Sequence, residues 1–159
     1  MPELSHFDEH GASRMVDVAG KPESRRTARA SCIVTMAAAT VAAIRDKSLS
    51  KGEVLEVARL AGIMAAKKTA ELIPLCHPLP LTSVQLDFEF QGETQLRIEA
   101  SVATVARTGV EMEAMVAASV AALTVYDMVK SIDRGVTIGP IALEEKTGGV
   151  RGDYRRTVN

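Results

Sequence analysis

The strongest constraint on the fold is a pair of stretches in which apolar and polar residues alternate on either side of a short turn. The turn is Gln91-Gly92-Glu93-Thr94, and the apolar positions around it are Val84, Leu86, Phe88, Phe90, Leu96, Ile98, Ala100 and Val102. Because successive side chains on a strand point to opposite faces, this pattern predicts a β-hairpin with one apolar and one polar face. The polar face carries several charges, so we expect it to be wet or to make polar contacts.

Four other segments show the periodicity of secondary structure. Residues 26–34 alternate as a strand does, and residues 136–143 predict a last strand in which Gly139-Pro140 marks a bulge or an edge position. Residues 50–72 and 110–131 predict two helices, and the second has no charge from Ala114 to Val125, which predicts burial on most sides. The prolines between residues 73 and 81 predict a stiff, extended connection.

The order strand, helix, strand, strand, helix, strand predicts an α+β fold of the ferredoxin-like βαββαβ type. Such a fold has an antiparallel four-stranded sheet with the helices on one face. A chain of 159 residues is expected to form one domain. We expect an N-terminal arm over residues 1–24, the ferredoxin-like domain with any catalytic site over residues 25–145, and a flexible C-terminal tail over residues 146–159.

The charge and cysteine content narrow the class of protein. Lys plus Arg is 19 and Asp plus Glu is 20, so the net charge of −1 argues against bulk electrostatic binding to nucleic acid or anionic membrane. The N-terminus is acidic and polar, and the chain has no long uninterrupted apolar run, so we expect neither a secretion signal nor a membrane span. Two cysteines, Cys32 and Cys76, do not make a disulfide framework. A cytoplasmic protein is expected.

The proline-flanked segment around Cys76 and His77 is a candidate for chemistry. Adjacent side chains of an extended chain point in opposite directions, so these two residues are not expected to form a nucleophile and base pair. His77 is suited to act as an acid, a base or a hydrogen-bond donor to phosphate. The alternative is a buried, hydrogen-bonded histidine with a structural role. No spacing typical of a metal site is present, so no metal is expected.

A second candidate lies near the end of the later helix. Asp127 and Lys130 are three residues apart, so they share a helix face and are able to pair. A coupled Asp–Lys pair is a common acid–base device, whereas a structural ion pair is the plainer interpretation.

The acidic residues of this helix set a geometric constraint. Glu111 and Glu113 stand in its first turn, where carboxylates also stabilise the helix dipole. Glu113 and Asp127 project along nearly the same face but lie about 21 Å apart at 1.5 Å per residue. They cannot both reach one small substrate within a single chain, so either two subunits combine or the two ends serve different pockets.

Basic residues gather in the first half of the chain and acidic residues around the hairpin. This asymmetry suits a small anionic substrate, although an ordinary solvated surface explains it as well. A rival hypothesis is a non-catalytic ferredoxin-like module that binds RNA or a regulatory ligand, and a further one is a structural oligomer. RNA-binding sheets expose aromatic side chains, but Phe88 and Phe90 share the apolar phase of their strand and are expected to face the helices.

Three strings are specific when taken together: LIPLCHPL at residues 72–79, TGVEMEA at 108–114 and AALTVYDMVK at 121–130. With Met15–Val18, Lys51-Gly52 and residues 61–69, they resemble the molybdenum cofactor biosynthesis protein C (MoaC) family over nearly the whole chain. The resemblance implies a ferredoxin-like subunit assembled as a homohexamer, a trimer of dimers, with its active site at a dimer interface. It also implies a substrate, a cyclised dihydroguanosine triphosphate, that is converted to cyclic pyranopterin monophosphate with release of pyrophosphate and without a cofactor.

The resemblance also assigns roles to residues. It implies an acid–base pair of Asp127 and Lys130, with Asp127 as the principal catalytic residue and Lys51 as a further proton-transfer group. The residues it places at the substrate are Leu75, Cys76, His77, Met112, Glu113, Arg26, Lys67, Lys146 and, as a weaker candidate, Glu111. One departure is visible: Val150 stands where the family often has a lysine, and Arg151 follows it.

Overall fold

The computed structural model describes residues 5–49 and 53–157. The elements, in chain order, are β1 (Ser24–Thr35), α1 (Ala38–Arg45), α2 (Val54–Lys67), α3 (Thr69–Leu72), β2 (Leu81–Gln91), β3 (Gln95–Ala106), α4 (Glu111–Val129), β4 (Thr137–Thr147) and β5 (Tyr154–Arg155).

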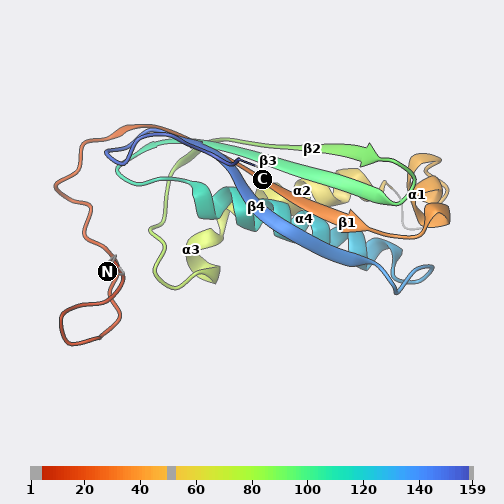
Figure 1. Ribbon diagram of the computed structural model, residues 1–159, viewed down its shortest axis with the longest axis horizontal. Coiled ribbons are helices and arrows are strands. Elements are labelled where there is room, and N and C mark those ends of the chain that lie inside the picture. The colour runs from red at the N-terminus through yellow and green to blue at the C-terminus, as the bar shows by residue number, and fades with distance from the viewer. Residues whose placement is uncertain (1–4, 50–52, 158–159) are drawn as a thin grey trace.

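The strands form one sheet in the order β2-β3-β1-β4-β5, and every neighbouring pair is antiparallel. Helices α2 and α4 lie against one face of this sheet (Figure 1). This arrangement confirms the predicted α+β class and the ferredoxin-like order of elements. It differs from the four predicted strands by one, because the C-terminal segment turns back after Thr147 and pairs Tyr154 with Lys146 as the short strand β5.

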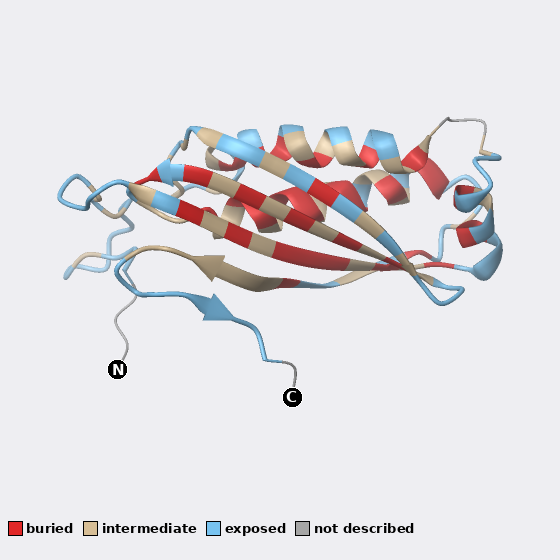
Figure 2. Ribbon diagram, turned by 90° about the horizontal axis from the view of Figure 1, so that it is seen from above, coloured by how far each residue is buried: buried red, intermediate tan, exposed pale blue. Residues whose placement is uncertain are grey.

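The core lies between the sheet and the helices, as the buried residues in Figure 2 show. Helix α4 is packed against α2 on one side and the sheet on the other, which confirms the prediction that its uncharged middle is buried. By length and composition alone, α4 is apolar enough to cross a membrane, but half of that stretch is buried against the rest of the chain, as in the core helix of a soluble protein. Close contact of α2 with α4 depends on Gly62, where an added Cβ would lie 2.9 Å from the Ala117 carbonyl oxygen.

The hairpin β2–β3 confirms the prediction made from the alternation of apolar and polar residues. Phe88 and Phe90 are partly buried against the core, on the helix side of the sheet. Each ring also lies under a guanidinium, that of Arg59 for Phe88 and that of Arg45 for Phe90. The sheet therefore does not present these two aromatic rings on its open face.

The helix predicted over residues 50–72 is interrupted. The chain leaves helical geometry at Lys68, so that α2 ends at Lys67 and the single turn α3 follows. The buried Thr69 hydroxyl donates a hydrogen bond across the break to the Ala66 carbonyl at 3.0 Å.

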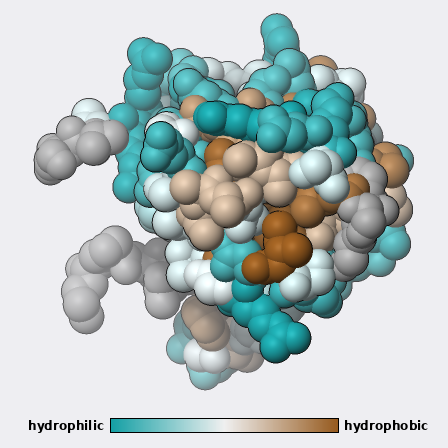
Figure 3. Space-filling model, turned by 90° about the vertical axis from the view of Figure 1, so that its right-hand side faces the viewer, coloured by the Kyte–Doolittle hydropathy of each residue, from teal (hydrophilic) through white to brown (hydrophobic). Residues whose placement is uncertain are grey.

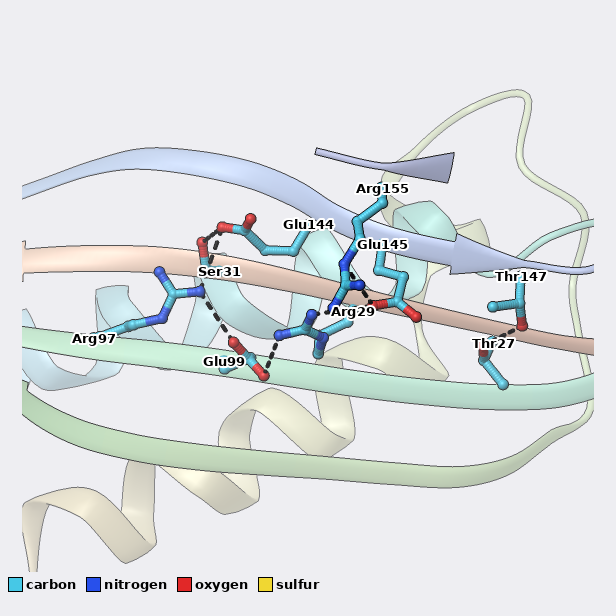
Figure 4. A network of polar contacts seen from close by, with 9 residues as sticks. All are labelled: Thr27, Arg29, Ser31, Arg97, Glu99, Glu144, Glu145, Thr147 and Arg155. Atoms are coloured by element: carbon cyan, nitrogen blue, oxygen red, sulfur yellow. Dashed lines mark hydrogen bonds and ion pairs between the residues drawn. The ribbon is translucent and has the colours of Figure 1, made fainter. Parts of the chain in front are cut away.

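A network of ion pairs covers the open face of the sheet (Figure 4). Arg29 on β1 joins Glu99 on β3, at 3.0 Å, to Glu145 on β4, at 3.1 Å. Glu144 also reaches this face, where it accepts a hydrogen bond from Ser31, because a register shift in the β1–β4 pairing adds one residue to β4. The polar contacts expected on this face are confirmed.

Candidate active site

A pocket lies at the end of the sheet where four segments meet: the N-terminal arm, the proline-rich connection before β2, the β3–α4 connection and the end of β4. Its volume is about 360 Å³. The predicted site residues that line it are Arg26, Leu75, Cys76, His77, Glu111, Met112, Glu113 and Lys146. Residues from four separate parts of the sequence are therefore brought to one place.

Lys67 lies in a smaller adjoining pocket of about 130 Å³. This smaller pocket shares His77, Leu79 and Glu113 with the larger one, so the three side chains form the boundary between them. Lys67 is exposed at the end of α2 and lies within the same region of the molecule.

Glu113 is the buried carboxyl group of the pocket, with 4% of its surface exposed. Burial raises the pKa of Glu113 to about 7, the hydrogen bond from its own backbone N–H opposes this, and the neighbouring Glu111 adds to the increase. The carboxyl is therefore able both to give and to accept a proton near neutral pH. The Glu111 carboxylate lies against Gly109, so a Cβ at this position would displace the carboxylate.

His77 and Cys76 both reach the pocket, but they differ in their contacts. His77 Nε2 lies 2.7 Å from the Val16 carbonyl oxygen, and because a carbonyl only accepts, this nitrogen carries the proton. Burial raises the pKa of the Cys76 thiol, and the nearby Glu113 raises it further. The thiol form of Cys76 is thus favoured over the thiolate that nucleophilic catalysis requires.

Arg26 supplies a buried positive charge at the pocket wall. Only 8% of the residue is exposed, its Nη2 donates to the Arg107 carbonyl oxygen at 3.3 Å, and its Nε is buried with no hydrogen-bond partner among the described residues. Gly149 lies directly against the guanidinium, so that even a Cβ at this position would collide with Nη1. A buried guanidinium with an unused donor is suited to hold an anion.

Three further basic side chains line the pocket: Lys21, Arg107 and Arg151. Sequence reasoning did not select Arg107, although it directly precedes the Thr108-Gly109 string and its basic type was a usable signal. Nor did it select Val16 and Val18 as pocket residues, because nothing local indicates where an irregular arm packs. The N-terminal arm and the C-terminal turn are far apart in the sequence, and they meet at the pocket only in the folded chain.

Asp127 and Lys130 form a close ion pair at 2.6 Å, but at the opposite end of α4. Both side chains are more than half exposed, and hydrogen bonding to Asp127 raises the pKa of Lys130. This is the end at which Asp133 binds the start of α1. Figure 3 views that end and shows hydrophobic surface bordered by hydrophilic side chains. Lys51 lies outside the described residues.

Within residues 5–49 and 53–157, no group of three or more His, Cys, Asp or Glu side chains is placed to hold a metal ion. The pocket instead combines basic side chains with one protonatable carboxyl, one imidazole and apolar walls. This set is suited to bind a polyphosphate and to transfer protons.

Comparison with known proteins identifies a family that matches this chain. Residues 15–149 match the MoaC family. A protein of Thermomicrobium roseum called cyclic pyranopterin monophosphate synthase is 59% identical over 157 residues, which cover 98% of this chain and 95% of that protein. Proteins of the same name from Brevibacillus brevis and Parvibaculum lavamentivorans are 53% and 56% identical, and the matches cover 97% and 96% of this chain and 96% of each relative.

Proposed function

Because the chain belongs to the MoaC family, we propose that the pocket is the substrate site of a cyclic pyranopterin monophosphate synthase. The protein is an enzyme of molybdenum cofactor biosynthesis and of the lyase class. It converts a cyclised dihydroguanosine triphosphate to cyclic pyranopterin monophosphate and releases pyrophosphate. One observation supports this pocket as the site: it is lined together by Arg26, His77, Glu113 and Lys146.

The basic residues bind the triphosphate. Arg26 and Lys146 come from adjacent strands, and Arg151 and Lys21 stand at the same pocket. Their charges neutralise the phosphate oxygens in the ground state and the charge that develops as the cyclic phosphate forms and pyrophosphate leaves. Lys67 lies in the adjoining pocket, beyond His77, and binds the terminal phosphate of the triphosphate.

The protonatable groups serve the ring rearrangement. Opening the guanine imidazole ring and closing the pyran and pyrazine rings require repeated proton transfers. Glu113, whose pKa is about 7, is poised for transfer in either direction at the base, while Leu75, Cys76 and Met112 give it apolar walls. Asp127 is the principal catalytic residue in this proposal, with Lys130 and Lys51 as its partners in proton transfer.

The site is completed by a second protomer. Asp127 is separated from the pocket by most of the length of α4, so within one chain it does not reach a substrate bound beside Glu113. Leu123, one turn before Asp127, and Ile132 after it are 57% and 55% exposed, which is apolar surface suited to a subunit contact. We propose a homohexamer built as a trimer of dimers, in the cytoplasm, with one end of α4 from each protomer at every site.

The direct test supplies the purified protein with the product of the preceding radical enzyme. We expect pyrophosphate and cyclic pyranopterin monophosphate to appear in equal amounts, as followed by phosphate release coupled to a pyrophosphatase and by mass spectrometry. The matched control is the Arg59→Ala variant, which changes an arginine in the middle of α2 that lines neither pocket, and it should keep full turnover. Absence of both products from the wild-type protein would refute the assignment.

A further inference from the structure

The N-terminal arm lies across the pocket instead of extending away from the domain. Val16, Val18 and Lys21 form part of the pocket lining, together with Ser5 and His6 from the start of the arm. The arm has no regular secondary structure between Met15 and Ala19, and it is largely exposed on its outer side. Its position therefore depends on a small number of specific contacts.

Two side chains from distant parts of the sequence hold the arm by its backbone. His77 binds the Val16 carbonyl oxygen at 2.7 Å, and Arg107 Nη1 donates to the Ala19 carbonyl oxygen at 2.5 Å. The segment between these two points is turned by its own contacts, from the Ala19 N–H to the Asp17 carboxylate at 2.8 Å and from the Lys21 N–H to the Val18 carbonyl at 3.0 Å. The arm is fixed on both sides of Val18.

Arg107 makes a second contact that links the arm to the anion-binding wall. Its backbone carbonyl accepts a hydrogen bond from Arg26 Nη2 at 3.3 Å, while its side chain holds the arm at Ala19. Arg107, the residue after β3, thus contacts both the buried guanidinium and the arm. Arg107 therefore connects the arm to the wall that carries Arg26.

We propose that Arg107 is a positioning residue that holds the N-terminal arm closed over the pocket, opposite Arg26. The arm then forms the wall against which the phosphates bind. The identity of the phosphate ligand rests on the proposed function, but the clamp does not. Substrate binding in this arrangement requires a closed arm, and Arg107→Ala frees the arm while leaving the carbonyl that binds Arg26.

The test compares Arg107→Ala and Arg107→Lys with Arg59→Ala, which removes a similar contact between an arginine and a carbonyl, from Arg59 Nη1 to Leu86, outside both pockets. Hydrogen exchange is measured on peptides that cover residues 15–21, and binding of inorganic tripolyphosphate is measured by calorimetry. For Arg107→Ala we expect arm exchange to be faster, and tripolyphosphate binding weaker, by about 10-fold or more, as the loss of a charged hydrogen bond implies. Arg107→Lys should recover part of both, and Arg59→Ala should match the wild type.

Three outcomes would overturn the proposal. The first is unchanged arm exchange in Arg107→Ala, and the second is faster exchange with unaltered tripolyphosphate affinity. The third is an Arg107→Lys variant with restored affinity and a fast-exchanging arm, because charge alone would then explain the role of Arg107. With the nucleotide substrate, Arg107→Ala should raise KM and leave kcat within about 2-fold. A protein that binds tripolyphosphate as described but does not turn over the nucleotide would refute the proposed function and keep the clamp.

Discussion

Glu113 is buried in the first turn of α4, whereas Asp127 is exposed near its last turn, on nearly the same face and about 21 Å away along the axis. One is at the pocket, and the other is beside exposed apolar surface at the far end of the molecule. A single rigid helix therefore separates two groups that the proposed reaction needs together. In the proposed dimer-interface site, the helix is used from both ends, by two copies of the chain.

This relationship predicts complementation between two inactive variants. Glu113→Gln and Asp127→Asn should each lose turnover, because each removes a proton-transfer group. After unfolding and refolding as a mixture, half of the dimers carry one copy of each variant, and one of the two sites in such a dimer is intact, so we expect about a quarter of wild-type activity. Steady-state turnover of the mixture measures this value, and activity no greater than that of the separate variants would show that both groups belong to one chain's site.

The buried carboxyl of Glu113 predicts a specific dependence of stability on pH. Its pKa is raised from 4.5 to about 7, so the folded protein keeps this proton over a range in which the unfolded chain has lost it. The free energy of unfolding should fall as pH rises from 4.5 to 7, by about 3 kcal/mol for this group, and stay at the lower value above that range.

Glu113→Gln should remove that dependence. We expect this variant to be more stable than the wild type at about pH 8 and close to it at about pH 5, as measured by urea unfolding. The control is Glu93→Gln, which changes an exposed carboxyl in the β2–β3 turn and should leave the pH dependence intact. An equal pH dependence in Glu113→Gln and the wild type would mean that Glu113 is ionised in the fold.

The ion pair of Asp127 and Lys130 is predicted to matter for chemistry and not for folding. Both side chains are largely exposed, and exposed ion pairs contribute little to stability. Asp127→Asn should therefore unfold at nearly the same urea concentration as the wild type but turn over the substrate about 100-fold or more slowly, because general acid–base groups contribute effects of that size. Glu56→Gln breaks the corresponding pair with Arg59 on α2, also three residues apart, and should keep activity.

The contact of Gly149 with Arg26 predicts a loss of ligand affinity without a general loss of structure. A Cβ at Gly149 collides with the guanidinium, so Gly149→Ala should displace Arg26 and weaken tripolyphosphate binding by about 10-fold or more. Gly152→Ala is the matched control, because Gly152 has a similar positive φ of 70° but nothing within 4 Å of the added Cβ. Equal affinities of the two variants would show that backbone strain, and not Arg26, controls binding.

The close approach of α2 to α4 predicts a stability effect far from the substrate site. An added Cβ at Gly62 would lie 2.5 Å from Leu86 Cδ2 and 2.9 Å from the Ala117 carbonyl oxygen. Although alanine favours a helix over glycine, Gly62→Ala should lower the free energy of unfolding by about 1–3 kcal/mol, because overpacking outweighs helix propensity. Gly20→Ala has open space around its Cβ and should change stability little; urea unfolding compares the two.

Much of the fold was already determined by local pattern. Alternation at Leu86 and Ile98 identified the hairpin, and the uncharged run in α4 identified the buried helix, because period and burial are both properties of neighbouring residues. The break at Lys68 and the strand β5 were not predicted. Both depend on contacts with residues far along the chain or on a turn whose geometry composition does not define.

For the candidate site, local sequence identified the chemical types: a histidine on a stiff segment, acids at the start of one helix, and an Asp–Lys pair near its end. Which of these groups meet depends on the folding of the whole chain. Val16, Arg107 and Gly149 close the pocket around Arg26 through contacts between segments that are 61 to 123 residues apart. Burial then raises the pKa of Glu113, and no local pattern contains that information, because desolvation is a property of everything that surrounds the group.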